Sequence, residues 1–256
     1  MTTWDPSQYL RFERERTLPC RDLIARIGGP DPVRVVDLGC GSGTSTALLR
    51  ERWPGAALVG VDNSAEMIAA ARRSSVAAEW LVADIGSWQA APPFDLVFSN
   101  AALHWLPDHE RLFPHLLRQV APGGTLAVQM PINFESPAHR AVREVAASPG
   151  WARRWPVDGA GPRVGSAESY YRLLAKEGPP PEIWQTEYVH VLPDAASILE
   201  WLKGTTLRPY LTVLSAPQDR DAFLAEIEEL LRSAYPPQPD GRVLFPFRRL
   251  FLVARR

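Results

Sequence analysis

Residues 33–44 read Val33-Arg34-Val35-Val36-Asp37-Leu38-Gly39-Cys40-Gly41-Ser42-Gly43-Thr44, an apolar run that meets an acid and then three glycines at alternate positions. Short β-branched apolar runs are typical of parallel strands that are buried on both faces. Glycines follow where a chain turns sharply and its backbone approaches a ligand closely. This stretch therefore predicts a buried strand whose end enters a ligand-binding loop.

Two other interpretations of these glycines are disfavoured. A turn with no binding role does not account for the acid, Asp37, that stands just before them. The dinucleotide fingerprint of nicotinamide dehydrogenases spaces its glycines G-x-G-x-x-G, and Thr44 stands where its third glycine belongs. The carboxylate of Asp37 would also repel a pyrophosphate, so it suits a ligand with a cationic or amine group.

The D-x-G-x-G-x-G pattern of residues 37–43 resembles the first motif of class I S-adenosylmethionine methyltransferases. The cofactor of that class carries a sulfonium, an amine and a ribose. The resemblance implies that S-adenosylmethionine binds here and leaves as S-adenosylhomocysteine, with contacts from Asp37, Gly39, Cys40 and Gly41. We interpret Cys40 as a small packing residue of the loop and not as a nucleophile.

Two further apolar segments end on acids in the order that such a site requires. Residues 59–62 form a strand that ends on Asp62, about 20 residues past the glycine loop, where nucleotide-binding α/β sites place an acid for the ribose hydroxyls. Asn63 and Ser64 then cap a helix. A third strand, residues 80–85, closes on the acid that faces the adenine amine in the family. The contacts implied beyond the glycine loop are Asp62, Asn63, Met67, Asp84, Ile85 and Asn100.

Composition restricts the class of protein. The chain has 256 residues, 46% of them hydrophobic, which allows one large domain or a core with a lid. Its net charge of -1 argues against non-specific nucleic-acid binding, which needs a basic face. Two cysteines without metal-ligand spacing indicate no metal site and no disulfide. With no signal peptide or membrane-spanning apolar stretch, we expect a cytoplasmic monomer or small homo-oligomer.

The order of elements indicates the fold class. Strands and helices alternate up to Pro131, which predicts a parallel sheet covered by helices on both faces. The family resemblance makes this an α/β, Rossmann-like, seven-stranded sheet with an antiparallel last strand and a mainly helical cap. Within 1–131 we expect a lid helix (4–12), a second helix (19–27) and the cofactor-binding half of the core. A cap insertion is expected in 132–165, followed by a core helix and strand in 166–193. A helical cap insertion in 194–240 and the final core strand in 241–256 complete the predicted order.

Several segments narrow the resemblance to the trans-aconitate 2-methyltransferase family, and the similarity runs from the first residues to the last. The more discriminating ones are Trp105-Leu106-Pro107-Asp108-His109, Gln129-Met130-Pro131 and Leu207-Arg208-Pro209. This family methylates a carboxylate of trans-aconitate, a small tricarboxylic acid, to a methyl ester. One departure follows the fifth strand, where Ile132-Asn133-Phe134 replaces Asp-Asn-Trp, and residues 148–163 are rearranged.

The chemistry of that reaction explains why no catalytic base is expected. A carboxylate is ionised at neutral pH, with a reference pKa near ~4, so it is already the nucleophile. Its other carboxylates need cations and hydrogen-bond donors, and arginine binds a carboxylate bidentately. Arg248-Arg249 interrupts an apolar strand, and alternation points one of the two inward; we expect Arg249. The predicted substrate contacts are Tyr9, His104 (as a positioning residue), Gln129, Arg208, Tyr210 and Arg249.

Other functions on the same fold stay open. A phenol or carbon acceptor would need a base near the methyl group, with His104 the candidate. Another acid, or a non-catalytic S-adenosylmethionine-binding role, is also compatible with the cofactor motifs. Methylation of a flipped base is disfavoured because Ser99-Asn100-Ala101-Ala102 stands where such enzymes carry Asn-Pro-Pro-Tyr.

Overall fold

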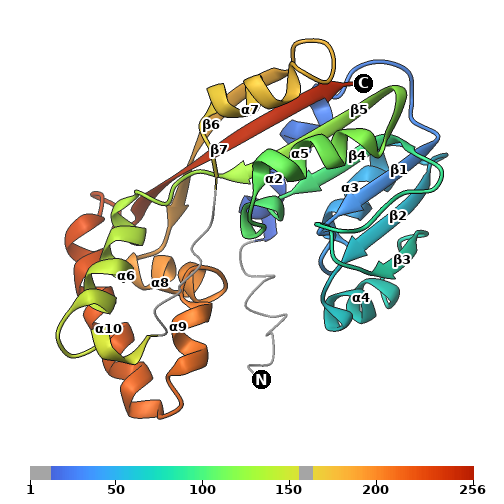
Figure 1. Ribbon diagram of the computed structural model, residues 1–256. Helices are drawn as coiled ribbons and strands as arrows, with labels where there is room; N and C mark the ends of the chain where they lie inside the picture. Colours follow the sequence, from blue (N-terminus) through green and yellow to red (C-terminus); the bar gives the residue numbers. More distant parts are fainter. Residues whose placement is uncertain (1–12, 156–163) are drawn as a thin grey trace. The chain divides into compact units, whose positions relative to one another are not determined.

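A computed structural model describes residues 13–155 and 164–256 (Figure 1). The predicted helix at 4–12, with Tyr9, lies outside these residues. The chain forms two compact units. We call the described residues within 16–131, 162–186 and 249–256 the sheet unit, and those within 1–15, 132–161 and 187–248 the helical unit.

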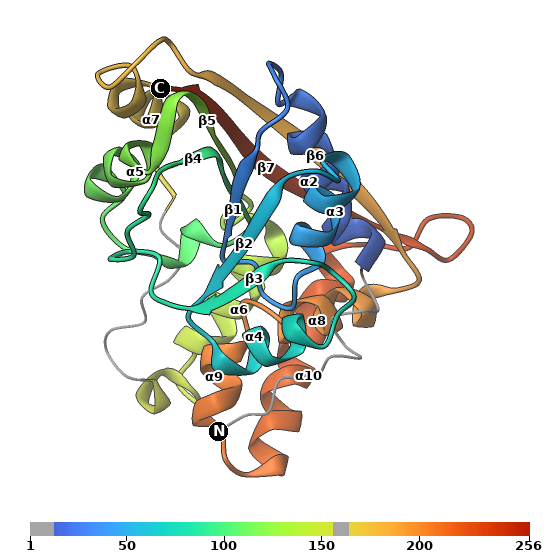
Figure 2. The ribbon, with the colours of Figure 1, turned by 90° about the vertical axis from the view of Figure 1, so that its right-hand side faces the viewer.

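Seven strands form one sheet in the order β3-β2-β1-β4-β5-β7-β6. Their bounds are β1 Arg34–Leu38, β2 Ala57–Asp62, β3 Glu79–Val82, β4 Phe94–Asn100, β5 Val120–Pro131, β6 Glu182–Leu192 and β7 Val243–Arg255. In Figure 2, β1, β2 and β3 lie side by side, in agreement with their parallel registers. β7 pairs antiparallel with β5, with Gln129 opposite Phe251. The predicted seven-stranded fold is confirmed.

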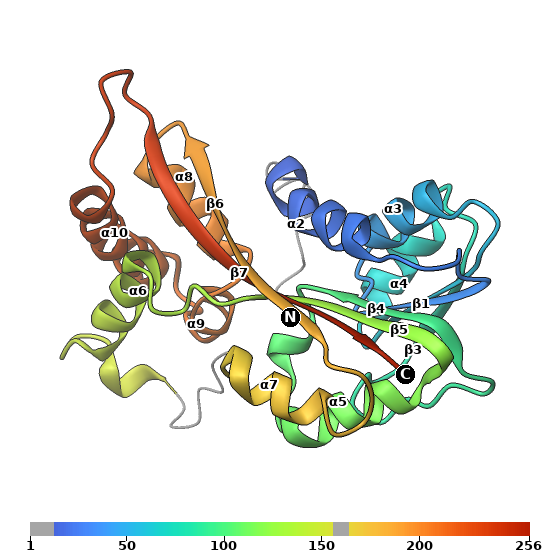
Figure 3. The ribbon, with the colours of Figure 1, turned by 90° about the horizontal axis from the view of Figure 1, so that it is seen from above.

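Helices cover both faces of the sheet, as predicted. Figure 3 shows α2 (Glu13–Arg26), α3 (Thr44–Arg52) and α4 (Ala65–Arg72) on one face, and α5 (His109–Arg118) and α7 (Ala167–Leu174) on the other. β1 is buried from Val35 to Leu38, which explains its near-continuous apolar sequence. The carboxyl ends of β1, β2, β4 and β5 meet at one edge, where ligands of such sheets bind.

Three predicted boundaries were wrong. The helix predicted over 19–27 is α2 and begins earlier, at Glu13, with Pro19 inside it, because the fixed φ of proline fits a helix even where its N–H is lost. β3 ends at Val82, before Asp84, whose carboxylate accepts from Gly86 N–H at 3.0 Å and makes a turn. The fifth strand, predicted over Thr125–Met130, is β5 and begins at Val120, because that residue still pairs with Phe94 of β4.

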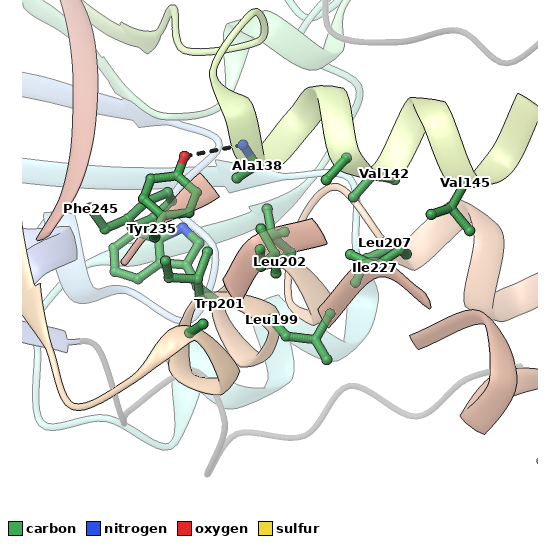
Figure 4. Close-up of a cluster of buried hydrophobic side chains, with 14 of the residues drawn as sticks. Ala138, Val142, Val145, Leu199, Trp201, Leu202, Leu207, Ile227, Tyr235 and Phe245 are labelled. Atoms are coloured by element: carbon green, nitrogen blue, oxygen red, sulfur yellow. Dashed lines mark hydrogen bonds between the residues drawn. The ribbon is translucent and has the colours of Figure 1, made fainter. Parts of the chain in front are cut away.

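The helical unit has its own apolar core, drawn in Figure 4. Helix α10 (Pro217–Ala234) packs against α6 (Pro137–Ala147) and α8 (Ala195–Lys203), and α9 (Arg208–Val213) packs against α8. Helix α6 lies in the segment 132–165, where we expect a cap insertion but predict no particular helix. Its signals were a Ser-Pro start at Ser136 and a helical apolar spacing at Ala138, Ala141, Val142, Val145 and Ala146.

The two units and the predicted domains divide the chain at different places, with one exception. Both divisions break the chain after Pro131. The units also split β6 between Thr186 and Glu187, and β7 between Arg248 and Arg249, whereas the prediction assigned each strand wholly to the core. These strands have 11 and 13 residues, long enough for each to run through both units. The lid role of the chain start and the cap role of 132–165 and 194–240 stay predictions.

Among the described residues, no helix is both long and apolar enough to cross a membrane.

A single hydroxyl tests the packing of the helical unit. The Tyr235 hydroxyl accepts a hydrogen bond of 3.1 Å from the backbone N–H of Ala138, at the start of α6 (Figure 4). That donor is buried and has no partner within its own helix, so Tyr235→Phe leaves it unsatisfied and lowers the free energy of unfolding by about 1–2 kcal/mol. Urea titrations followed by tryptophan fluorescence measure the change.

Tyr171→Phe is the control, because Tyr171 is 47% exposed and should alter stability little. Equal effects of the two substitutions would contradict a structural role for the Tyr235 bond.

Candidate active site

The glycine loop joins β1 to α3 and has a backbone that requires glycine. Gly39, Gly41 and Gly43 have φ values of +74°, +54° and +92°. A Cβ atom on Gly39 would lie 2.1 Å from the Cβ of Ala102, far inside van der Waals contact. The loop that follows β1 therefore packs directly against the segment that follows β4.

Hydrogen bonds tie this loop to the end of β2. The Gly39 N–H donates to the carbonyl of Val61 at 2.8 Å, and the Gly41 N–H donates to Asp62 Oδ2 at 2.9 Å. The other oxygen, Asp62 Oδ1, accepts from the Ser64 N–H at 2.9 Å. The glycine loop and the acid predicted for the ribose are thus one hydrogen-bonded assembly.

Asp37 is a buried acid, 1% exposed, at the end of β1. Its Oδ2 accepts from the hydroxyls of Ser45 and Thr46 at 2.6 Å each. Its Oδ1 is buried and has no hydrogen-bond partner within the described residues. Burial raises the pKa of Asp37 from 3.8 to about 6, against the two hydroxyls, which lower it. A ligand that brings a positive charge would stabilise the ionised form.

The other predicted cofactor residues have varied surroundings. Asn63 is exposed and Met67 half-buried, in the first turn that Ser64 caps by accepting from the Met67 N–H at 3.2 Å. Asp84 is exposed after β3 and bonds its own turn, while Ile85 is buried beside it. Their cofactor roles stay predictions.

Two more members of the predicted set lie along the carboxyl edge. Asn100, the last residue of β4, is in register with Gln129 of β5, and its Oδ1 is buried with no partner among the described residues. Cys40 is buried, and burial raises the pKa of its thiol well above the usual range, with Asp37 and Asp62 adding to the effect. The thiol is therefore protonated at neutral pH, in keeping with a packing residue.

S-adenosylmethionine fits this set of groups. Its ammonium, sulfonium and ribose hydroxyls are cations or hydrogen-bond donors. The loop edge offers oxygens, and Asp37 Oδ1 and Asn100 Oδ1 are buried acceptors without a partner within the described residues. A buried acceptor left unsatisfied costs free energy, so a ligand donor at these atoms would be stabilising.

A second group of buried polar side chains lies in the sheet unit, on β5, on β7 and in the segment after β4. Arg249, Gln129 and His104 are 5%, 0% and 5% exposed. Arg249 Nη1 donates to Gln129 Oε1 at 3.5 Å, and Gln129 Nε2 is buried with no partner among the described residues. The neighbouring Arg248 is exposed, so the predicted alternation is confirmed. The contacts of these residues with substrate stay predictions.

His104 is neutral at physiological pH. Burial lowers its pKa to about 3, and the positive charge of Arg249 acts in the same direction, as would that of His109 if its ring were protonated. It lies in the short helix η1 (Leu103–Trp105), and its ring centroid is 4.7 Å from that of Trp105. A neutral imidazole beside a buried guanidinium can donate or accept a hydrogen bond, but it is a weak base.

The remaining substrate predictions do not fall in this group. Arg208 and Tyr210 lie on α9 of the helical unit, and Tyr9 lies outside the described residues. Arg208 is exposed. Tyr210 is half-buried, with its ring centroid 4.9 Å from that of Trp155; burial raises the pKa of its hydroxyl, and Arg143 opposes the rise.

Sequence reasoning missed several polar residues. Ser45 and Thr46, which bond Asp37, begin the helix after the glycine loop, and that position was the available signal. Asn133 of the helical unit is 2% exposed, and neither polar atom of its side chain has a partner within the described residues. Ala101, at φ +53°, is in a conformation that no sequence pattern announces.

Comparison with known proteins assigns the class. Residues 35–124 match the family model described as a methyltransferase domain. The phosphoethanolamine N-methyltransferase 2 of Haemonchus contortus, crystallised with S-adenosyl-L-methionine, has the same fold with a TM-score of 0.55 at 18% identity, over 92% of this chain and 52% of its own. The protein is a class I, S-adenosylmethionine-dependent methyltransferase.

Full-length relatives give the family. A trans-aconitate 2-methyltransferase of Azoarcus sp. is 52% identical over 100% of both chains. One of Methylobacterium nodulans is 51% identical over 100% of this chain and 99% of its own. The chain belongs to the trans-aconitate 2-methyltransferase family, as its motifs indicated.

The close approach at Gly39 allows a test of cofactor binding. Gly39→Ala puts a Cβ into the Cβ of Ala102 at a positive φ, so the glycine loop must move. We expect S-adenosylmethionine affinity to fall at least about 100-fold, since displaced backbone contacts and strain cost on the order of 3 kcal/mol. Isothermal titration calorimetry measures the dissociation constant.

Gly55→Ala is the matched control, because its added Cβ meets nothing within 4 Å and its backbone is not in the left-handed region. An unchanged affinity for Gly39→Ala would show that the loop does not form the cofactor site.

Proposed function

We propose that this protein transfers the methyl group of S-adenosylmethionine to a carboxylate oxygen of trans-aconitate, giving a monomethyl ester and S-adenosylhomocysteine. Full-length relatives with about half of their residues identical to this chain carry that activity in their names, which supports the assignment. The small-molecule acceptor is an anion, and no nucleic acid or membrane takes part in the proposed reaction.

The buried pair Arg249 and Gln129 is the observation that carries the proposal. Arg249 presents a planar guanidinium whose donors match a carboxylate bidentately. Gln129 directs its carbonyl oxygen to Arg249, which leaves its buried N–H₂ group as a donor. A buried cation beside amide donors is selective for an anion, and a polycarboxylate supplies carboxylates beyond the one that reacts.

The reaction needs alignment more than proton transfer. When bound, S-adenosylmethionine supplies an electrophilic methyl group. Asp37 and Asp62 bind the methyl donor, and Arg249 with Gln129 orients the methyl acceptor. Since the attacking carboxylate is already ionised, no side chain has to remove a proton. Holding the two reactants in near-attack geometry supplies on the order of 7–11 kcal/mol.

The state of His104 argues against the alternative acceptors. A phenol or a carbon acid would need a base matched to neutral pH. Burial holds the pKa of His104 at about 3, far below that requirement. We therefore assign His104 the role of a neutral hydrogen-bonding group that positions the substrate.

We also propose a cytoplasmic location and a monomeric or small homo-oligomeric state. Cys20 and Cys40 are both buried free thiols, in keeping with a reducing compartment. Size-exclusion chromatography with light scattering tests the oligomeric state.

A panel of acids with adjacent arginine variants tests the function. Labelled S-adenosylmethionine is incubated with di- and tricarboxylic acids, phenols and carbon acids, and the products are identified by mass spectrometry. We expect the methyl ester of trans-aconitate from the wild type. Arg249→Met should lower kcat/KM at least about 100-fold, because a charge-assisted bond to the substrate is lost, and should leave cofactor affinity unchanged.

Arg248→Met is the matched control, because the adjacent arginine is exposed and should change kcat/KM less than about threefold. Methylated phenols or carbon acids, without any ester, would show that the acceptor is not a carboxylate. Cofactor binding without any methylated product would indicate a non-catalytic protein.

Kinetics of a His104 variant distinguish a positioning role of His104 from base catalysis. His104→Ala should raise KM for trans-aconitate about tenfold and lower kcat less than about tenfold, because one neutral hydrogen bond is lost. A fall in kcat of about 100-fold or more, with the loss of an acidic limb from the wild-type pH profile, would identify His104 as a base. Steady-state kinetics between pH 5.5 and 8.5 distinguish the two.

A further inference from the structure

A chain of hydrogen bonds connects α7 to the segment that carries His104. Within the sheet unit, the Gly165 N–H donates to the Tyr170 hydroxyl at 2.9 Å, and that hydroxyl lies 2.6 Å from His109 Nδ1. The opposite ring nitrogen, His109 Nε2, lies 2.9 Å from the carbonyl oxygen of Leu103.

Chemistry sets the direction of every bond in this chain. A carbonyl oxygen only accepts, so His109 Nε2 carries the hydrogen that it donates to Leu103. In a neutral ring, Nδ1 is then an acceptor, and the hydroxyl of Tyr170 donates to it. Burial raises the pKa of Tyr170 to about 12 and lowers that of His109, so both groups have the required protonation state at neutral pH.

The anchored carbonyl belongs to the peptide plane that begins His104. The carbonyl of Leu103 and the N–H of His104 share one rigid peptide unit, so holding the oxygen restricts the direction in which the His104 side chain leaves the backbone. The same oxygen accepts from the Leu106 N–H at 2.9 Å, which uses its second lone pair.

The backbone before this plane is strained. Ala101 has a φ of +53°, a region that residues with a Cβ rarely adopt. Such a conformation persists where surrounding bonds over-determine it, and the Ala101 N–H donates to the Gln129 carbonyl at 2.9 Å. The turn that places His104 therefore depends on tertiary bonds at both of its ends.

We propose that His109 and Tyr170 are positioning residues that hold His104 in the orientation required by the acceptor substrate. They act through the Leu103 peptide. Tyr170 is fully buried, and its ring centroid is 4.7 Å from that of Phe113. The Tyr170 end of the hydrogen-bond series is therefore anchored in the core. The kinetic part of this proposal rests on the proposed function.

The groups that face His109 determine how it titrates. They are Asp108 at the start of α5, His104 in η1 and Tyr170 in α7. Protonation of His109 would place a hydrogen on Nδ1, which could then no longer accept from the Tyr170 hydroxyl. The series of hydrogen bonds from Tyr170 to Leu103 would be interrupted there. Tyr170→Phe removes a bond that favours the neutral ring, so it should raise the pKa of His109 toward its ordinary value.

Two measurements on Tyr170→Phe test the proposal. Long-range ¹H–¹⁵N spectra of the wild type should show His109 neutral, with the hydrogen on Nε2, at pH 8, and the titration of His109 should move to higher pH in the variant. KM for trans-aconitate should rise about tenfold while the dissociation constant of S-adenosylmethionine stays within about twofold, since one neutral hydrogen bond is lost far from the cofactor acids.

Tyr171→Phe is the control on the same helix, because Tyr171 is 47% exposed. His109→Gln keeps one donor and one acceptor on a planar group and should retain activity within about threefold, whereas His109→Leu should lose about as much as Tyr170→Phe.

Unchanged KM and an unshifted His109 spectrum in Tyr170→Phe would overturn the proposal. Equal losses of substrate and cofactor affinity would also overturn it, because they would mark a general structural role. The spectra do not depend on which acid is methylated, so a failure of the proposed function remains distinguishable.

Discussion

The contact between Gly39 and Ala102 is the constraint on which the rest of the site depends. A β-carbon on Gly39 would lie 2.1 Å from that of Ala102, so the loops after β1 and β4 meet with no space for a side chain. The loop after β1 bonds Asp62 through the Gly41 N–H and belongs to the part of the site that we propose for the cofactor. The loop after β4 continues through the strained Ala101 into η1 and His104. One close approach thus fixes the spacing between the two loops that we propose for the cofactor and the substrate.

Burial then assigns the charges, with opposite effects on acids and bases. It raises the pKa of Asp37 to about 6 and lowers that of His104 to about 3, because in each case the charged form loses hydration. A nearby cation favours the ionised form of Asp37, which suits a sulfonium cofactor with an ammonium group. His104 is neutral, so in the proposed function the buried guanidinium of Arg249 supplies the positive charge for an anionic acceptor. In the proposed function, the sheet unit therefore separates an anionic cofactor side from a cationic substrate side.

Much of the sheet unit could be predicted from local sequence. Apolar runs that end on acids located β1 and β2, and strand alternation correctly placed Arg249 inward and Arg248 outward. Predictions failed where a neighbour overrides the local pattern. β3 stops before Asp84 because the carboxylate of Asp84 accepts from the Gly86 N–H and forms a turn. β5 begins earlier than predicted because Val120 still pairs with Phe94 of β4. Helix α6 was missed because it lies among prolines, glycines and arginines, although its apolar spacing was present.

The sequence by itself determined the class of cofactor, the fold and the family, because these depend on residue types at fixed spacing along the chain: an acid before three glycines, and motifs that run from end to end. Tertiary structure alone decided which polar groups are buried and how they are oriented. The hydroxyls of Ser45 and Thr46 on Asp37, the neutral state of His104 and the bond chain from Tyr170 to Leu103 all join residues distant in sequence or depend on exclusion of water. Hydration and hydrogen-bond direction are properties of a site in space, and no spacing along the chain encodes them.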